Sequence, residues 1–269
     1  MSNRWLKGGV TILGAVFLST LGIFAADGLQ GIDSRLSNIA GIKGSSICER
    51  GMTLMQGPLT SLCVDVYEAS PSSECPYTQP INISQTEQNA TTENCVAESK
   101  AGVQPWGYVA LPQAQRICAS SGKRLPTSEE WYRIILGTNP QSCVISESSP
   151  QVTGTESCIA ASGVHDGVGN LWEWVDATVQ GNTLNGQILP QTGYVTSVDS
   201  QGIAITSGEN PDEIYGKDYF WSKEEGVFGM IRGGFYGSKE DAGLYTTNAS
   251  VPTSFASQGV GFRCVKDIL

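Results

Sequence analysis

The sequence predicts a loop-rich α+β fold, and three observations favour it. Glycine is frequent, with 32 residues in a chain of 269, which is typical of folds whose connections need positive φ angles. Two neighbouring segments, 111–118 and 128–135, carry helical patterns. Beyond Gly137 these patterns end, and turn residues separate short segments that are typical of strands. We therefore expect two helices, short strands and long loops.

The first 27 residues predict a targeting and membrane segment. Arg4 and Lys7 precede an uncharged run over residues 8–26, which Asp27 ends. Its length is close to the about 20 residues of a membrane helix, and the basic residues place the remainder outside the cytoplasm. A signal peptide cleaved after Ala26 is the alternative, and it would give a secreted protein.

Residues 28–46 predict a helical stem and a linker. Apolar residues recur at helical spacing before a Gly- and Ser-rich end, and they are Leu29, Ile32, Leu36 and Ile39. A folded domain is expected over 47–269, with insertions at 70–104 and 176–225. A stem that packs into a filament, as in pilin-like surface proteins, is a structural alternative.

Charge and cysteine content narrow the class of protein. The net charge is −10 and no run of Lys or Arg exists, so nucleic-acid binding is excluded. An even number of cysteines in an exported chain favours disulfides over metal ligands. They are Cys48, Cys63, Cys75, Cys95, Cys118, Cys143, Cys158 and Cys264.

Local signals define three elements. Pro112 fits the first turn of a helix that begins at Leu111. Thr127 and Glu130 form a capping box for the second helix. Residues 63–69 alternate between apolar and polar side chains, which predicts a half-buried strand. Arg124, between the helices, is expected to make structural hydrogen bonds.

Four motifs follow one another along the chain. They are residues 122–131 (Gly-Lys-Arg-Leu-Pro-Thr-Ser-Glu-Glu-Trp), 169–174 (Gly-Asn-Leu-Trp-Glu-Trp), 232–234 (Arg-Gly-Gly) and 259–264 (Gly-Val-Gly-Phe-Arg-Cys). Together they resemble the signature of the formylglycine-generating enzyme family, also called the sulfatase-modifying factor domain, over about residues 47–267. The resemblance implies a C-type lectin-like fold of the formylglycine-generating enzyme type, with two helices packed on short antiparallel sheets.

The resemblance also implies a disulfide between Cys118 and Cys264. Pairing the other cysteines with their nearest neighbours gives Cys48 with Cys63, Cys75 with Cys95, and Cys143 with Cys158, although the sequence alone leaves these three pairings open. The sequons at Asn82 and Asn89 would carry no glycan in a bacterial chain, which we expect this to be.

In the resembled family, the loop at 166–173 holds a calcium ion. The implied ligands are the side chains of Asp166 and Glu173 and the main-chain carbonyls of Gly169 and Leu171, a set of hard oxygens that suits calcium. The ion would be structural. The alternative is a tight turn in which Glu173 pairs with an arginine. Trp172 and Trp174 alternate with Glu173 and are expected in the core.

Enzymes of the resembled family carry a cysteine pair shortly after Arg-Gly-Gly, and here residues 235–241 contain none. The iron-dependent branch needs several histidines, whereas His165 is the only one in this chain. We therefore expect neither copper nor iron, and no catalysis. An oxidase with a non-standard site is the alternative.

Residues 230–264 resemble the C-terminal variable region of proteins that retroelements diversify, which randomise solvent-facing positions between fixed motifs of this fold. Aromatic and small polar side chains occupy those positions here, as in adaptable binding surfaces. The sequence thus predicts an inactive cell-surface protein that presents a loop surface to a protein or glycan on another cell or phage. The predicted ligand-binding residues are Phe235, Tyr236, Ser238, Lys239, Asp241, Tyr245, Thr247, Ser250, Ser254, Phe255 and Ser257.

Overall fold

The computed structural model describes residues 47–57, 61–155 and 157–268. The membrane helix and the stem predicted for residues 1–46 lie outside this part of the chain. None of the helices described is both long and apolar enough to cross a membrane.

Three α-helices are described: α2 (Ile83–Thr91), α3 (Leu111–Ser120) and α4 (Ser128–Ile135). The predicted capping box of α4 is confirmed, because Thr127 Oγ1 accepts from the N–H of Glu130 at 3.2 Å and the Glu130 carboxylate accepts from the N–H of Thr127 at 2.8 Å. Arg124 makes the predicted structural bonds, with Glu130 and Asp267.

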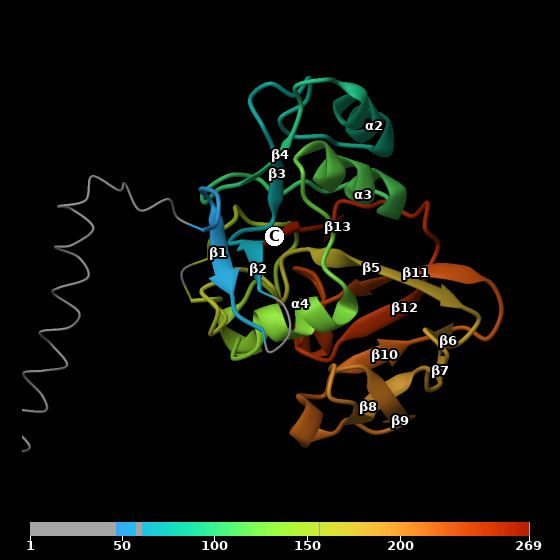
Figure 1. Ribbon diagram of the computed structural model, residues 1–269. Coiled ribbons are helices and arrows are strands. Elements are labelled where there is room, and N and C mark those ends of the chain that lie inside the picture. Colours follow the sequence, from blue (N-terminus) through green and yellow to red (C-terminus); the bar gives the residue numbers. More distant parts are fainter. Residues whose placement is uncertain (1–46, 58–60, 156, 269) are drawn as a thin grey trace, which may run out of the picture. The chain divides into compact units, whose positions relative to one another are not determined.

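The sequence did not predict α2, which packs on α3 (Figure 1). The asparagines of both sequons stabilise this part of the fold. Asn82 caps α2 by accepting from the N–H of Gln85 at 3.0 Å. Asn89 is buried and holds the main chain of Tyr77 through two hydrogen bonds. The insertion at 70–104 therefore has a folded structure of its own.

The strands form three sheets (Figure 1). The first has the order β1 (Met52–Met55), β2 (Leu62–Asp65) and β14 (Val265–Asp267), and the second joins β3 (Ala69–Pro71) to β4 (Ala97–Ser99). The third has nine strands. Its order is β7 (Gln187–Ile188), β6 (Thr183–Leu184), β5 (Trp172–Gln180), β11 (Val227–Arg232), β12 (Thr247–Val251), β10 (Tyr219–Trp221), β8 (Gly193–Val198) and β9 (Ala204–Gly208), with β13 (Val260–Gly261) paired to β5.

Two features of the sheets correct the sequence prediction. The pairs β10–β12 and β5–β13 are parallel, whereas only antiparallel pairing was expected. The strand predicted over 63–69 is divided between β2 and β3, and it is not half-buried, because Asp65 and Glu68 are enclosed with the apolar residues. Short 3₁₀ turns lie at Pro140–Ser142, Glu213–Tyr215 and Lys239–Asp241.

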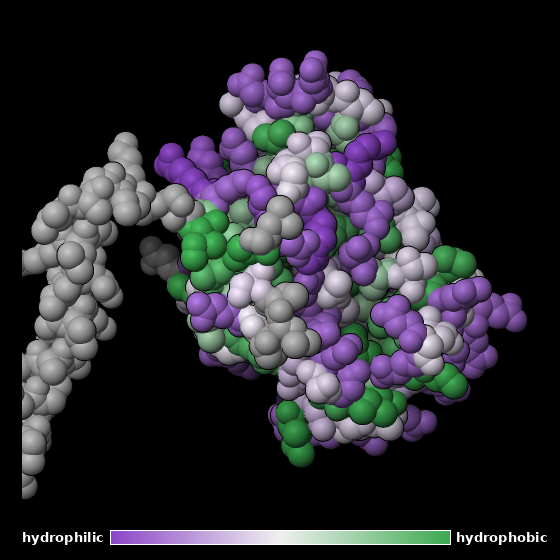
Figure 2. Space-filling view, in the orientation of Figure 1, coloured by the Kyte–Doolittle hydropathy of each residue, from purple (hydrophilic) through white to green (hydrophobic). Residues whose placement is uncertain are grey.

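Two hydrophobic clusters cover the two faces of the nine-stranded sheet. On one face, α4 contributes Trp131, Ile134 and Ile135, which pack with residues such as Met230 and Phe220. On the other face, α3 lies over a cluster that contains Leu111, Ile117, Trp174, Ile231 and Phe262. The middle of the sheet is therefore a rigid layer between α3 and α4. In Figure 2, hydrophobic side chains on the visible surface form small separate patches, one of them over β1.

Four disulfides take up all eight cysteines of the chain. Cys118 pairs with Cys264, as the resemblance implied, and the three pairings that the sequence left open are the nearest-neighbour ones: Cys48 with Cys63, Cys75 with Cys95, and Cys143 with Cys158. The pair between Cys118 and Cys264 closes a sequence separation of 146 residues and fixes α3 to the segment before β14.

We expect replacement of both Cys118 and Cys264 by Ala to destabilise the protein more than the same change at Cys75 and Cys95. The longer closed loop restricts the unfolded chain more, and the losses should be roughly 4–5 and 3 kcal/mol respectively. Urea denaturation of both double variants gives the two free energies of unfolding. An equal loss, or a larger one for Cys75 and Cys95, would contradict the loop-length argument.

Candidate ligand-binding groove

A buried ion pair lies beneath the candidate site. The guanidinium of Arg263 contacts both carboxylate oxygens of Glu173, with its Nε at 2.9 and 2.8 Å. Both side chains have 0% exposure. Trp131 Nε1 donates to the same carboxylate at 2.7 Å, and Arg263 also donates to the main-chain carbonyls of Asp65 and His165. The ion pair thus connects β5 to the end of β2 through Arg263 and to α4 through Trp131.

A second buried carboxylate orders the loop before β5. Glu68 accepts from the N–H of Leu171 at 3.0 Å and from the side-chain amide of Asn170 at 2.5 Å. Burial, followed by the nearby charges of Asp166 and Glu173, raises the pKa of Glu68 well above its ordinary value. The carbonyl of Asn170 in turn accepts from the N–H of Tyr236 at 2.9 Å, so this loop positions the segment after Arg-Gly-Gly.

The two side chains predicted to bind calcium, Asp166 and Glu173, already have protein partners in this arrangement. Both oxygens of Glu173 face Arg263 and Trp131, and those of Asp166 accept from the N–H groups of Gly154 and Thr155 at 2.5 and 3.2 Å. The alternative reading of this loop, a turn whose glutamate pairs with an arginine, describes the geometry.

Arg232 is the second buried arginine. Its guanidinium lies over Trp131, at 4.8 Å from the ring centroid, and donates to the carbonyls of Ser128 at 3.0 Å and Gly202 at 2.7 Å. No carboxylate forms a salt bridge with it in the part of the chain described, and its Nε lacks a hydrogen-bond partner. Burial lowers its pKa to about 10. Nearby, burial raises the pKa of Asp218 to about 7.

The two glycines after Arg232 reverse the direction of the chain. Their φ angles are +92° at Gly233 and +84° at Gly234, which side-chain-bearing residues rarely adopt. A Cβ at Gly233 would lie 2.6 Å from the carbonyl oxygen of Gly167. The turn brings Phe235 and Tyr236 to the surface beside β5 and β12. The Arg-Gly-Gly motif therefore positions these two side chains.

A groove of about 500 Å³ lies at this position. Its aromatic side chains are Trp172, Phe235, Tyr236 and Phe255, and Phe255 is 43% exposed. Amide, hydroxyl and aliphatic groups complete the lining, and Lys223 supplies the only charge on it. The remaining lining residues are Ile231, Asn248, Ser250, Val251, Pro252, Ser257, Gln258, Gly259 and Val260. The groove is thus lined mainly by apolar side chains with a few polar ones among them, as ligand sites commonly are.

The structure divides the eleven predicted ligand-binding residues. Five of them line the groove: Phe235, Tyr236, Ser250, Phe255 and Ser257. Ser254 is exposed beside Phe255. Ser238, Lys239 and Asp241 line a different cavity of about 800 Å³, together with Lys217 and Glu213.

Two predicted residues face away from the groove. Thr247 was expected at the surface, but it has 0% exposure because it alternates with Asn248 and Ser250 along β12 and points to the other face of the sheet. Tyr245 packs on Tyr132 and Tyr215, with ring centroids 5.9 and 5.6 Å apart. The predicted surface is therefore smaller and more localised than expected.

Sequence reasoning missed other aromatic residues next to the groove. Trp172 belongs to a core cluster, as predicted, but the sequence did not show that it also lines the groove. Tyr219 and Trp221 on β10 lie beyond it, in the insertion at 176–225. Their signal was the Tyr-Phe-Trp run, since alternation along a strand puts its first and last ring on one face.

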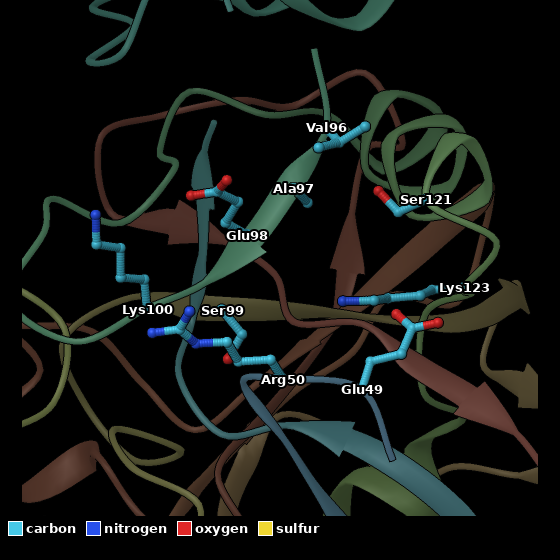
Figure 3. A pocket seen from close by; sticks show the side chains of 9 residues that line it. All are labelled: Glu49, Arg50, Val96, Ala97, Glu98, Ser99, Lys100, Ser121 and Lys123. Atoms are coloured by element: carbon cyan, nitrogen blue, oxygen red, sulfur yellow. The ribbon is translucent and has the colours of Figure 1, made fainter. Parts of the chain in front are cut away.

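Another cavity, of about 560 Å³, is lined by residues near β1, in β4 and after α3 (Figure 3). Its charges are mixed and partly paired. Lys123 binds the buried Asp65 at 2.7 Å, and Glu49 pairs with Lys266. None of the predicted ligand-binding residues lines this cavity, so the groove is the better candidate.

Residues 145–268 match the family model of the sulfatase-modifying factor enzyme 1-like domain. This stretch contains three of the four motifs, so the resemblance is confirmed for this part of the chain. A comparison with curated proteins finds no match.

Among solved structures, the Major Tropism Determinant U1 variant is similar with a TM-score of 0.50 and 19% identity, over 84% of this chain and 55% of that one. The M1 variant has a TM-score of 0.49 and 17% identity, over 83% and 54%. Treponema denticola variable protein 1 has a TM-score of 0.40 and 9% identity, over 81% and 99%. The chain thus spans about 55% of the length of the U1 variant. It has the predicted C-type lectin-like fold of the formylglycine-generating enzyme type.

We expect Glu173→Gln to destabilise the protein by about 3 kcal/mol or more, because it leaves the buried Arg263 without its counter-charge. Glu87→Gln is the matched control. Its pair with Arg116 is about half exposed, so its loss should cost about 0–1 kcal/mol. Thermal and urea unfolding of the two variants measure both values. Similar losses would contradict the structural role given to the buried pair.

Calcium gives a further test of the loop at 166–173. Because Arg263 and main-chain donors occupy the carboxylates, we expect the melting temperature to be the same with excess calcium and with a chelator. Differential scanning fluorimetry of the full chain measures it. A rise with calcium that Glu173→Gln abolishes would show that the carboxylates rearrange around an ion.

Proposed function

We propose that this protein binds a ligand on another cell or on a phage through the groove, outside the cytoplasm, and without catalysing a reaction. The observation that carries the proposal is the groove itself. Trp172, Phe235, Tyr236 and Phe255 offer large rigid contact areas, and amide and hydroxyl groups surround them. Adaptable binding surfaces combine these side-chain types.

The groove lacks the groups that the family chemistry needs. The side chains on its lining include neither a carboxylate, a histidine nor a thiol. All eight cysteines of the chain are in disulfides, which leaves no thiol for a copper site. His165, the lone histidine, stacks against Tyr67 with ring centroids 5.0 Å apart and does not line the groove. These observations support recognition over catalysis.

The cysteines also support the proposed location. Disulfides persist in oxidising compartments, and four of them stabilise the described fold. The four disulfides therefore favour a location outside the cytoplasm. Anchoring through the N-terminal segment is part of the proposal, and it rests on the sequence of residues 1–27 alone.

The names of the similar structures point in the same direction. One is called a tropism determinant and another a variable protein. We propose by analogy that the groove residues after Arg-Gly-Gly are diversified between related copies. A reverse transcriptase gene nearby, with a near-copy of the codons for residues 230–264 that differs mainly at adenines, would support this. Codons conserved among related strains would contradict it.

We expect Phe255→Ala to weaken ligand binding about tenfold or more, since truncation of a central aromatic anchor is often this costly. The fluorescently labelled full chain would be titrated onto a panel of bacterial cells and phage particles, and saturable binding would be compared between variants. Ile188→Ala is the control, because Ile188 is an apolar residue with 72% exposure on β7.

Equal binding of the wild type and Phe255→Ala would contradict the proposed function. In parallel, the wild type would be incubated with a sulfatase-type cysteine peptide and copper. Turnover of that peptide would favour the alternative, an oxidase with a non-standard site.

A further inference from the structure

A row of aromatic rings continues the groove across the nine-stranded sheet. Trp221 contacts Trp172 edge to face, with ring centroids 5.8 Å apart. Tyr219 lies 4.6 Å from Trp221, and Tyr194 lies 4.9 Å from Tyr219. These four residues, which we call the aromatic row, come from β5, β10 and β8.

Strand pairing fixes the row on one face of the sheet. Tyr219 is the register partner of Tyr194, and Trp221 is that of Asn248, which lines the groove. Phe220, between the two rings of β10, points the other way and is fully buried in the cluster beneath α4. The row is therefore on the face that α3 covers over β5 and β11.

The row remains accessible beyond the edge of that helix. Tyr194, Tyr219 and Trp221 are half-buried, although they lie on a sheet whose middle is enclosed. Their polar atoms are also available. Within the described residues, no hydrogen bond is formed by the hydroxyls of the two tyrosines or by the indole N–H of Trp172 and Trp221. The row thus offers ring surfaces and free donors together.

Charge distinguishes the row and groove from the rest of the chain. The whole chain carries a net charge of −10, whereas Lys223 is the only charged residue of the groove lining. Its ammonium lies 5.6 Å from the centroid of Phe228 and pairs with no carboxylate in the residues that the structure describes. An exposed cation without a partner in an acidic protein suits a ligand that carries a negative group.

We propose that the aromatic row and the groove bind one polysaccharide chain that contains an acidic sugar. Sugar rings present C–H groups that pack on aromatic faces, and their hydroxyl and ring oxygens accept from indole N–H groups, phenols and amides. A carboxylate of the chain pairs with Lys223. Because the row lies on a sheet face, it offers a peptide ligand no strand edge to pair with, and this favours the glycan over an extended peptide. The inference rests on the proposed function and names the ligand class of that site.

The test uses the labelled full chain on an array of acidic and neutral polysaccharides, with each acidic polymer also present in carboxyl-reduced form. We expect the wild type to bind members with uronic or sialic acids, and carboxyl reduction to weaken binding about tenfold. Tyr219→Ala and Tyr194→Ala should each lose about fivefold or more, while Tyr194→Phe, which keeps the ring, should lose less.

Variants of Lys223 test the proposed pairing with the carboxylate more directly. Lys223→Gln should bind the acidic polymer as weakly as the wild type binds the reduced one, and it should no longer respond to reduction, whereas Lys223→Arg should retain the response. Ile188→Ala is the control for labelling and handling. Unchanged melting temperatures establish that each variant is folded.

Three results would overturn the inference: no array binding by the wild type, equal binding of acidic and reduced polymers, or row variants that bind like the wild type. If the array result refutes the glycan but the wild type still binds cells through Phe255, the proposed function stands and only the ligand class is wrong. Binding that needs Phe255, survives periodate and is lost after protease treatment identifies a protein ligand, which overturns the glycan but retains recognition. Cell binding that does not need Phe255 refutes the proposed function itself.

Discussion

The buried pair between Arg263 and Glu173 is the interaction on which the rest of the structure depends. Its guanidinium reaches a carboxylate 90 residues away in the sequence and a carbonyl 198 residues away. A charge enclosed in this way is stable only when all its partners are in place. The pair therefore links the C-terminal Gly-Phe-Arg motif, α4 and the early strand β2, and removal of any one partner would leave a buried charge without compensation.

Trp131 connects this pair to the second arginine. Its indole N–H donates to Glu173, while Arg232 lies over its ring. Arg232 has carbonyl partners and no salt bridge among the described residues, so packing and main-chain dipoles hold its charge in place. Gly233 and Gly234 then turn the chain at positive φ. The Arg-Gly-Gly motif therefore positions the main chain, and the side chains of Phe235 and Tyr236, which follow it, line the groove.

The sequence predicted features that local chemistry or a motif determines. The capping box of α4 and the disulfide between Cys118 and Cys264 are as expected, and the other three disulfides follow the nearest-neighbour pairing that the sequence left open. It failed where the outcome depends on distant partners. For Glu173 the sequence left an arginine partner open as an alternative, and only the fold identifies that partner as Arg263. The row depends on the pairing of β10 with β8, which places Tyr219 beside Tyr194, and with β12, which places Trp221 beside Asn248, and no local pattern shows either pairing. The helix α2 was missed because its sequence is polar and shows no apolar stripe. Its one local signal was Asn82, a residue type that is favoured at helix N-caps.

The distribution of charge argues that this fold can vary its surface without losing its support. Arg232, Arg263, Glu173 and Glu68 are buried in the scaffold, while the groove contains one lysine and neutral side chains. Tyr236 shows how the buried scaffold and the groove surface are separated. Its N–H donates to the carbonyl of Asn170 and its own carbonyl accepts from the N–H of Glu147, so the scaffold holds its main chain, while its ring packs on the ring of Phe235 within the groove lining. The main-chain hydrogen bonds of this position therefore do not depend on the identity of its side chain, which is what the proposed diversification of the groove would require.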